Sequence, residues 1–299
     1  MIKRPMKGAA VEDISDIRLP VFASPKIDGF RCVLDQTPKT SRLSPFPNLH
    51  LQDSLKGIVP LGEILDGEIV VGKRRGPGVL QRTSSGLTSV LGEPDFKLWV
   101  FDCFGHEPFQ DRHMIAGTLV RELRNPRVRF LRHEFIKTRF DLKNYLVDCL
   151  DQGFEGIITR DPQGPYKQGK STLREQFMLK IKPFEDAEGR VIGWYEQMEN
   201  TNEAKREITG KLKRSSAKAG KLAKGTLGGL VLRDLRTDVE VRVGGGYSDH
   251  QRAVLWRHRD QLLGSLVRYK KQTVGEKDKP RHPNFVEFVD FRPEWDMTD

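Results

Sequence analysis

The alternation of apolar and polar positions predicts short β-strands separated by helices over the first 183 residues. Strand, turn and strand are expected over residues 21–34, and further strands at residues 64–71, 96–102, 154–160 and 177–182. Helical periodicity is found at residues 51–56, 111–124 and 142–152, the last of which stops at Gly153. Residues 73–92 are rich in glycine and serine and are expected to form a surface loop with some helix.

After Pro183 the pattern changes to short strand-like runs separated by turn residues. These runs cover residues 189–195, 228–235 and 239–243, and a helix over 249–263 and a strand over 281–292 follow. Such spacing predicts a small antiparallel barrel. A chain of 299 residues is long enough for two domains. We therefore expect an α+β fold with domains at residues 1–183 and 184–299.

The stretch Lys26-Ile27-Asp28-Gly29-Phe30-Arg31 combines a lysine, a carboxylate, a glycine and an arginine directly after a predicted strand. A lysine amine becomes a nucleophile only where burial or neighbouring cations favour its neutral form. An ordinary turn with solvated charges explains the stretch equally well, so its assignment depends on the rest of the chain.

Two predicted strands carry carboxylates in otherwise apolar surroundings. Strand alternation places Asp66 and Glu68 on one face, where they need a cation or hydroxyl partner; an edge strand with one solvated face is the alternative. Glu155 begins another strand, immediately before Gly156. Phe101 is expected either in the core or stacked on a base, and the core is the default for an aromatic side chain.

Lys180 and Lys182 lie on one face of the strand over residues 177–182, while Leu179 and Ile181 face the core. Two ammonium groups side by side repel each other unless an anion lies between them, so a phosphate site is expected. The same two cations could lower the pKa of a nearby Lys26.

The overall composition favours a polyanionic partner. The chain has 51 lysines and arginines against 41 acids, a formal net charge of +10, which favours nucleic acid over a partner-free basic protein. The three cysteines are far apart in the sequence and form no C-x-x-C motif, so neither a disulfide framework nor a zinc site is indicated. A reducing cytosol is therefore expected. No apolar run of signal-peptide or membrane-spanning length is found.

A basic segment around residues 208–233 is predicted to be a loop between two strands of the second domain. It contains seven lysines and arginines and no acid. A flexible arm that grips a phosphate backbone is favoured over a solvated linker. The side chains of this segment that are predicted to contact a phosphate backbone are Lys211, Lys213, Arg214, Lys218, Lys221 and Lys224.

Taken in order, these stretches resemble the motifs of the covalent nucleotidyltransferases, and most closely those of the compact ATP-dependent DNA ligases of bacteriophages. The lysine stretch is similar to the motif K-x-D-G-x-R, and the later motifs are matched by Ser41-Arg42, Asp66-Gly67-Glu68, Trp99-Val100-Phe101-Asp102, Glu155-Gly156-Ile157 and Lys180-Ile181-Lys182. The run from Tyr166 to Lys182 is similar to the ligase pattern Y-x-x-G-R-S-T…E-Q…L-K-x-K. Two departures are Lys170, in place of arginine, and the ending, where Arg292 matches R-x-D-K but Glu294 and Trp295 take the later positions.

The resemblance implies an antiparallel-sheet adenylation domain followed by an OB-fold β-barrel, and an enzyme that seals nicks in duplex DNA through lysyl-AMP and DNA-adenylate. Lys26 is then the nucleophile, Asp28 orients it, and Lys180 and Lys182 hold the α-phosphate. The implied cofactors are ATP and Mg²⁺, for which Mn²⁺ can substitute. The remaining implied contacts are the metal with Glu155 and Glu68, adenine with Phe101, the ribose side with Arg31 and Glu68, the nick phosphate with Arg42, and nucleotide phosphates with Lys170 and Arg292.

The resemblance also implies a monomer without an obligate protein partner, acting on nicked DNA away from membranes. Its expected location is the cytoplasm, which is that of the infected bacterium for a phage-encoded enzyme. An RNA ligase and an mRNA-capping guanylyltransferase share the lysine chemistry and stay open as alternatives. A non-enzymatic basic nucleic-acid-binding protein would explain the charge but not the ordered series Lys26, Glu68, Glu155, Lys180 and Lys182.

Overall fold

The computed structural model describes residues 3–206, 212–215, 217–276 and 279–290. Contacts between residues divide the chain into two compact units, and the main division falls between Lys182 and Pro183. Within the described residues, no helix is long and apolar enough to cross a membrane.

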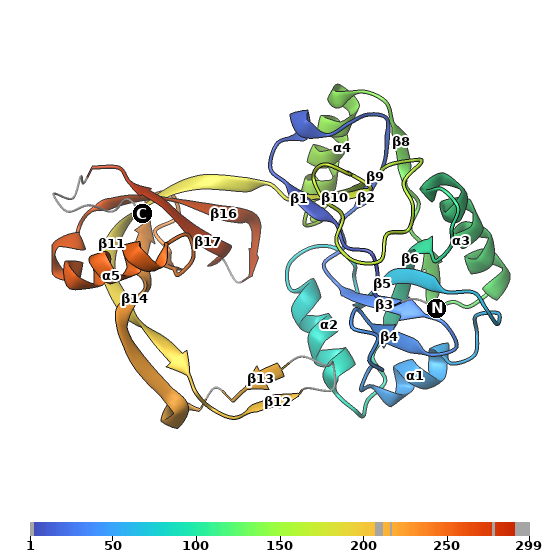
Figure 1. Ribbon diagram of the computed structural model, residues 1–299, viewed down its shortest axis with the longest axis horizontal. Helices are drawn as coiled ribbons and strands as arrows, with labels where there is room; N and C mark the ends of the chain where they lie inside the picture. Colours follow the sequence, from blue (N-terminus) through green and yellow to red (C-terminus); the bar gives the residue numbers. More distant parts are fainter. Residues whose placement is uncertain (1–2, 207–211, 216, 277–278, 291–299) are drawn as a thin grey trace. The chain divides into compact units, whose positions relative to one another are not determined.

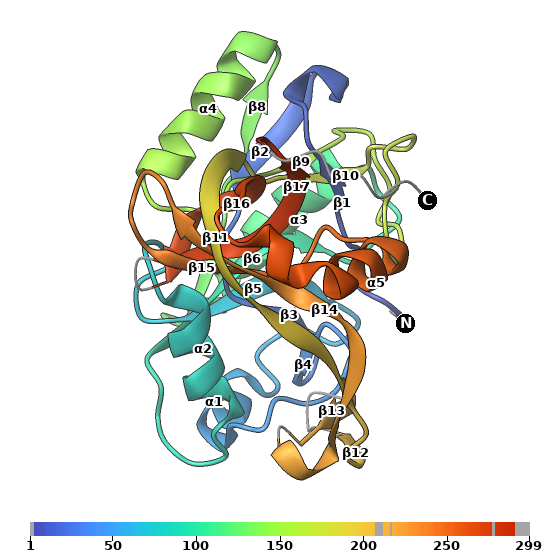
Figure 2. The ribbon, with the colours of Figure 1, turned by 90° about the vertical axis from the view of Figure 1, so that its left-hand side faces the viewer.

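The first sheet of the first unit has the strand order β1-β10-β9-β2-β8. Its strands are β1 (Ala9–Val11), β10 (Met178–Ile181), β9 (Ile157–Arg160), β2 (Val21–Pro25) and β8 (Glu134–Ile136). The pair β1–β10 is parallel and the other pairs are antiparallel. A short 3₁₀ helix, η1 (Ile14–Asp16), follows β1. Helix α4 (Arg139–Asp151) lies beside β8 (Figures 1 and 2), and its Leu142 and Leu146 join the core of this sheet.

The second sheet has the order β4-β3-β5-β6-β7, with a parallel pair at β6–β7. Its strands are β4 (Pro38–Thr40), β3 (Phe30–Leu34), β5 (Leu65–Val71), β6 (Phe96–Cys103) and β7 (Val128–Phe130). Apolar side chains of three helices complete its core, namely α1 (Leu49–Leu55), α2 (Val79–Thr88) and α3 (Phe109–Leu123). Helix α1 begins at Asn48, whose side chain accepts a hydrogen bond from Leu51 N at 2.8 Å.

The predicted strand, turn and strand over residues 21–34 form two strands, but not a hairpin. Strand β2 belongs to the first sheet and β3 to the second, so the chain crosses between sheets at residues 26–29. A side chain at Gly29 would place its Cβ 2.4 Å from Ile69 O, so only glycine fits where the crossing segment passes β5. Lys26 therefore lies at the junction of the two sheets.

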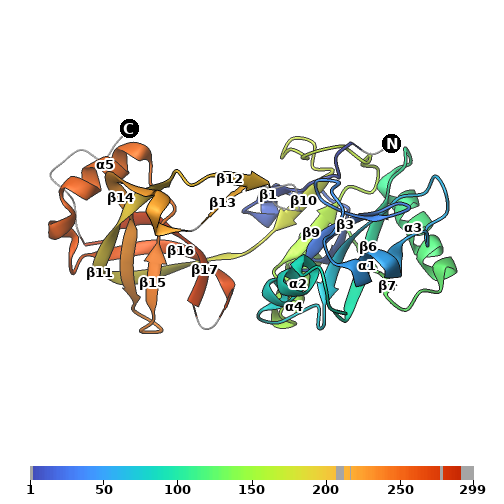
Figure 3. The ribbon, with the colours of Figure 1, turned by 90° about the horizontal axis from the view of Figure 1, so that it is seen from below.

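The second unit is built on a sheet with the order β15-β14-β11-β16-β17. Its strands are β11 (Phe184–Asn200), β14 (Lys221–Asp234), β15 (Glu240–Val243), β16 (Leu266–Glu276) and β17 (Lys279–Phe288). Figure 2 shows the long curved strands β11 and β14, and Figure 3 shows helix α5 (Asp249–Arg257) beside β14. Helix α5 begins with a capping box between Ser248 and Gln251 and is followed by η3 (Arg259–Leu262).

The two edges of this sheet approach each other. Gly245, two residues after β15, forms an isolated bridge with Asn284 of β17, and Phe285 N donates to Gly245 O at 2.9 Å. The antiparallel sheet therefore curls toward closure, as an OB-like domain requires. The predicted α+β fold is confirmed.

Two predicted loops contain more regular structure than expected. Residues 73–92 include the ten-residue helix α2, which places Leu87 in the core of the second sheet. The described part of the basic segment 208–233 is mainly strand, not loop. It includes β13 (Leu212–Arg214), paired with β12 (Ala204–Arg206), then η2 (Lys218–Gly220) and β14. The loop prediction failed because β14 pairs with β11 between Lys221 and Asp234, with bulges in the register.

Candidate active site

A cavity of about 240 Å³ in the first unit is lined by five of the side chains predicted from the sequence. It lies where the two sheets of this unit meet, and residues from both contribute. The predicted residues on its wall are Lys26, Arg31, Glu68, Phe101 and Lys180. Asp28, Arg42, Glu155, Lys170 and Lys182 do not line it.

The backbone of Lys26 is fixed to the segment that carries Glu155. Lys26 N donates to Gly156 O at 2.8 Å, and Glu155 N donates to Lys26 O at 3.3 Å. The next position is also constrained, because a Cβ at Gly156, whose φ is +149°, would lie 2.1 Å from Ile181 O. The chain thus brings the lysine, the carboxylate and the end of β10 into one place.

Glu155 lies between two ammonium groups. Its Oε2 contacts Lys26 Nζ and its Oε1 contacts Lys182 Nζ. Burial opposes ionisation of Glu155, but Lys26 and Lys182 outweigh burial and lower the pKa of the carboxyl group. Burial, and then the charge of Lys26, lower the pKa of the Lys182 ammonium. The sequence pairs Lys180 with Lys182 around a phosphate, which stays a prediction; in the structure a carboxylate lies between Lys26 and Lys182, and Lys180 lines the cavity.

Arg31 is held by a second buried carboxylate, Asp66. The guanidinium donates from Nε to Asp66 Oδ1 and from Nη2 to Oδ2, both at 2.5 Å, and from Nη2 to Met6 O at 3.0 Å. Tyr166 Oη donates to Asp66 Oδ2 at 2.5 Å. Burial alone would lower the pKa of Arg31, but the charge of Asp66 raises this pKa by more than burial lowers it. The guanidinium therefore stays charged.

Glu68 lies directly across from Arg31 in the β3–β5 pair and faces the cavity. Burial raises the pKa of its carboxyl group to about 7, although the charges of Arg31 and Lys26 act in the opposite direction. Asp66 and Asp28 add to the increase. Glu68 is thus poised to gain or lose a proton near neutral pH.

Phe101 enters the cavity through an irregularity in β6. Asp66 pairs with Asp102 and Gly67 with Val100, so Phe101 is the extra residue of a β-bulge. The Arg31 guanidinium lies 4.6 Å from the centroid of its ring. The bulge places one aromatic face beside the predicted nucleotide cavity.

A buried charge cluster adjoins the cavity and was missed by sequence reasoning. Asp102 accepts hydrogen bonds from Arg112 Nε at 3.0 Å and from Arg160 Nη2, and all three side chains are buried. Arg160 also lines the cavity, with Ser24, Lys7 and His133. The available signal was Asp102 itself, an acidic residue near the end of a mainly apolar strand.

Other predicted residues lie away from the cavity wall. Arg42 is exposed after β4, and its backbone N–H donates to Thr40 Oγ1 at 3.3 Å. Lys170 is exposed, but its backbone forms a bridge with Lys7, which does line the cavity. Asp28 lies in the crossing segment between the sheets. Lys211 and Arg292, with Glu294 and Trp295, are outside the described residues.

The described basic side chains of the second unit are spread over several elements. Lys213 and Arg214 belong to β13, Lys218 to η2, and Lys221 and Lys224 to β14. Of these, the exposed side chains are Arg214, Lys218, Lys221 and Lys224.

Within the described residues, no group of three or more histidine, cysteine or acidic side chains is arranged so that it could hold a metal ion. Glu68 lines the cavity, and both oxygens of Glu155 contact lysine ammonium groups. Carboxylate oxygens are the type of ligand that Mg²⁺ prefers.

An α+β unit with this cavity, followed by an OB-like unit, is the architecture of the nucleotidyltransferases whose motifs the sequence resembles. Residues 5–182 match the family described as "ATP dependent DNA ligase domain", and residues 219–288 match "DNA ligase OB-like domain". The chain therefore belongs to the ATP-dependent DNA ligase family, and the family predicted from the motifs is confirmed.

Similar structures and sequences agree with this family. The Chlorella virus DNA ligase-adenylate is 26% identical with a TM-score of 0.55, and the alignment covers 97% of this chain and 100% of that one. A Lig E DNA ligase, 22% identical with a TM-score of 0.71, covers 95% and 99% and supports the fold. The DNA ligase of African swine fever virus is 22% identical over 129 residues, 42% of this chain and 30% of that protein. The chain thus spans less than a third of the length of that viral relative.

Proposed function

We propose that this chain is an ATP-dependent DNA ligase that seals 5′-phosphate/3′-hydroxyl nicks in duplex DNA. The observation that carries the proposal is the placement of Lys26 on the cavity wall, in contact with a carboxylate that also contacts Lys182. We assign residues 1–183 to the adenylation domain and 184–299 to the OB-fold domain. The division of contacts between Lys182 and Pro183 supports this assignment.

In the first step Lys26 Nζ, after losing a proton, attacks the α-phosphorus of ATP. A P–N bond forms, the P–O bond to pyrophosphate breaks, and AMP stays on the lysine. The 5′-phosphate of the nick then takes AMP from Lys26, and the 3′-hydroxyl displaces AMP to form the phosphodiester bond. Each step increases negative charge around phosphorus, so cations fixed nearby stabilise it.

The side chains around Lys26 supply these cations. Lys180 lines the cavity and Lys182 lies within reach of Glu155, so both can contact the α-phosphate. The ion pair between Lys26 and Glu155 must open before attack, because an ammonium group has no free electron pair. Asp28, two residues from the nucleophile, orients the lysine in this proposal.

The nucleotide would place its base against Phe101 and its ribose beside Arg31 and Glu68. The bulge at Phe101 and the contact between its ring and Arg31 support this orientation. We assign Lys170 and Arg292 to nucleotide phosphates and Arg42 to the phosphate at the nick. The exposed position of Arg42 suits a contact with a large substrate.

Mg²⁺ is the proposed metal, with Mn²⁺ as a substitute, and Glu155 together with Glu68 would hold it. Such an ion supplies positive charge at the phosphate oxygens. Nicked duplex DNA is the proposed partner, bound by a monomer through Lys211, Lys213, Arg214, Lys218, Lys221 and Lys224. The exposure of Lys218, Lys221 and Lys224 supports this role.

Covalent labelling with α-³²P-ATP tests the nucleophile. The variant Lys26→Ala should carry no label after denaturation, while Lys143→Ala, on the exposed face of α4, should be labelled like the unmodified protein. Label on the Lys26 variant would refute the assignment.

The substrate class is tested by comparing nucleotides and nicks. We expect labelling by ATP and not GTP, and sealing of nicked DNA in preference to nicked RNA. Labelling by GTP would favour a capping guanylyltransferase, and preferential sealing of RNA would favour an RNA ligase.

A further inference from the structure

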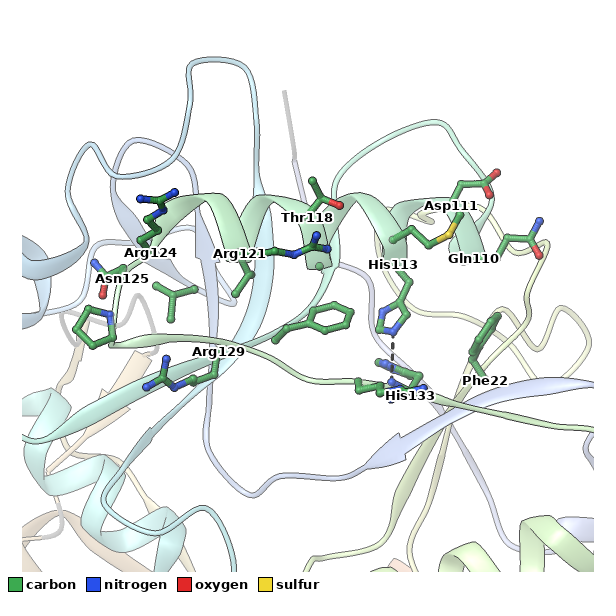
Figure 4. A pocket seen from close by; sticks show the side chains of 17 residues that line it. Phe22, Gln110, Asp111, His113, Thr118, Arg121, Arg124, Asn125, Arg129 and His133 are labelled. Atoms are coloured by element: carbon green, nitrogen blue, oxygen red, sulfur yellow. Dashed lines mark hydrogen bonds between the residues drawn. The ribbon is translucent and has the colours of Figure 1, made fainter.

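A second, larger hollow in the first unit lies between α3 and β7 and belongs to no step of the proposed reaction. Its volume is about 1320 Å³, and Figure 4 shows its lining side chains. One wall follows α3 from Gln110 to Arg124, a length of about 20 Å at 1.5 Å per residue. The other wall is the segment from Asn125 to His133, which contains β7. We call this hollow the α3–β7 groove.

The floor of the α3–β7 groove is aromatic. Phe130 packs directly beneath the helix, because Gly117 has no side chain there; a Cβ at Gly117 would lie 3.1 Å from Phe130 Cζ. His133 N donates to His113 Nε2 at 3.2 Å, and the two rings are 4.5 Å apart in an edge-on arrangement. Phe22 extends the floor beside His113 (Figure 4). These rings offer apolar and aromatic surface to a ligand in the groove.

The rim of the groove is strongly cationic. Arg124, directly after α3, and Arg129 of the opposite wall lie at one end of the groove, and Arg121 of α3 lies nearer its middle (Figure 4); Arg132 also lines the groove. All four arginines are exposed, and within the described part of the chain none of them pairs with a carboxylate. Asp111 is the acid among the lining residues, so the groove has a clear positive excess.

The backbone of β7 offers hydrogen bonds at the same place. Among the described strands, β7 is at the edge of its sheet. Leu98 N donates to Arg127 O, and Leu131 N donates to Val100 O. Because backbone groups alternate between the two sides of a strand, the N–H of Phe130 and the C=O groups of Val128 and Phe130 point away from β6. An edge of this kind is completed by an added strand.

We propose that the α3–β7 groove binds an extended acidic segment of a partner protein, which adds as a strand to β7. Acidic side chains would contact Arg121 and Arg129, while alternate apolar side chains would lie on the floor at Phe130. About six residues in extended conformation span the length of the groove. A peptide is favoured over nucleic acid because only a peptide backbone supplies the N–H and C=O groups that β7 requires.

Fluorescence anisotropy with synthetic peptides tests the proposal on the full chain. The probe is a fluorescein-labelled ten-residue peptide of alternating glutamate and isoleucine. It should bind with a dissociation constant on the order of 10 µM, as expected for a small transient interface. The same peptide with lysine in place of glutamate should not bind. A version N-methylated at alternate residues, which keeps the charge but loses the N–H donors, should bind at least tenfold more weakly.

Matched variants locate the binding site. Arg121→Glu with Arg129→Glu should weaken binding of the acidic peptide at least tenfold. Lys143→Glu with Arg174→Glu makes the same charge change at exposed positions outside the groove and should have little effect. Both double variants should keep lysine labelling by ATP, which shows that they fold.

Three results would overturn the proposal. These are no binding of the acidic peptide, binding that the groove variants leave unchanged, and equal binding of the N-methylated peptide. Single-stranded DNA of ten nucleotides serves as the competing class. Binding of that DNA with the same dependence on Arg121 and Arg129, without peptide binding, would assign the groove to nucleic acid instead.

Discussion

Two carboxylates in the first unit each lie between two cations, and they differ in burial and in the type of cation. Glu155 lies between Lys26 and Lys182, whose side chains are 19% and 23% exposed. Asp102 lies between Arg112 and Arg160, whose side chains are 0% and 1% exposed. The first cluster can change its contacts when a substrate arrives, whereas the second is closed to water.

The type of cation explains the difference. A lysine ammonium is a point charge on a flexible chain and can exchange one oxygen for another, such as a phosphate oxygen. An arginine has a planar fork of donors and fixes the carboxylate in one orientation. The Asp102 cluster joins β6, α3 and β9, and therefore fixes the strand that carries Phe101 against the strand that follows Glu155. We infer that the Asp102 cluster holds the walls of the cavity, while the partly exposed Glu155 cluster is the one proposed to act on the phosphate.

The largest expected effect is on stability, in Asp102→Asn. This change leaves two buried guanidinium groups without their anion, and breaking a buried ion pair costs about 3–5 kcal/mol. Urea denaturation should show this loss in the free energy of unfolding. Asp53→Asn, on the exposed side of α1, should change it by less than about 0.5 kcal/mol. A loss below about 1 kcal/mol for Asp102→Asn would contradict the structural role assigned to the Asp102 cluster.

The matching change at the other cluster, Glu155→Gln, should mainly affect catalysis. Removing one preorganised electrostatic contact at a reacting phosphate typically lowers the rate about 10²–10³-fold. Single-turnover labelling with α-³²P-ATP measures this rate. The urea midpoint of the variant should stay close to that of the unmodified protein, since both lysines can reach water. A large loss of stability with unchanged labelling would reverse the roles of the two clusters.

The contrast also shows what the sequence could predict. Lys26, Glu155 and Lys182 each lie in a short motif, and alternation along the strand predicted over residues 177–182 places Lys180 and Lys182 on one side, although β10 itself ends at Ile181. The Asp102 cluster depends on packing between residues as far apart as Asp102 and Arg160, which are 58 positions apart. No local pattern encodes that contact. The strands predicted on either side of Gly29 are present, but their partners could not be predicted for a related reason, since the two strands pair with distant segments in different sheets.

A pH-dependent effect should separate Glu68 from both clusters. Its pKa rises from 4.5 to about 7 on folding, so the folded state favours the protonated form. The stabilising effect is complete below about pH 4.5 and is lost as the pH rises through 7. Relative to Glu68→Gln, the unmodified protein should lose about 1–2 kcal/mol of unfolding free energy over this range, because partial exposure reduces the value of about 1.4 kcal/mol per pKa unit.

Urea titrations of both proteins at several pH values measure the Glu68 contribution. Labelling by ATP gives a second readout, because ionised Glu68 is the form proposed to hold the metal. Labelling of the unmodified protein should rise with pH through 7. If the unfolding free energy changes with pH in the same way in the protein and in Glu68→Gln, the raised pKa of Glu68 is contradicted.

The smallest expected effect concerns Asp66, which is intermediate between the two clusters. Asp66 is buried, but its partner Arg31 has a side chain 15% exposed and lines the cavity. Tyr166→Phe removes one hydrogen bond to Asp66 and leaves the fork of Arg31 in place, so a loss of about 1–2 kcal/mol is expected. If Asp66 acts like Asp102, urea denaturation will show the loss while the KM for ATP stays constant. If it acts like Glu155, the KM will rise with little change in stability, because Arg31 will have moved relative to Phe101. The bidentate contact at 2.5 Å favours the first result.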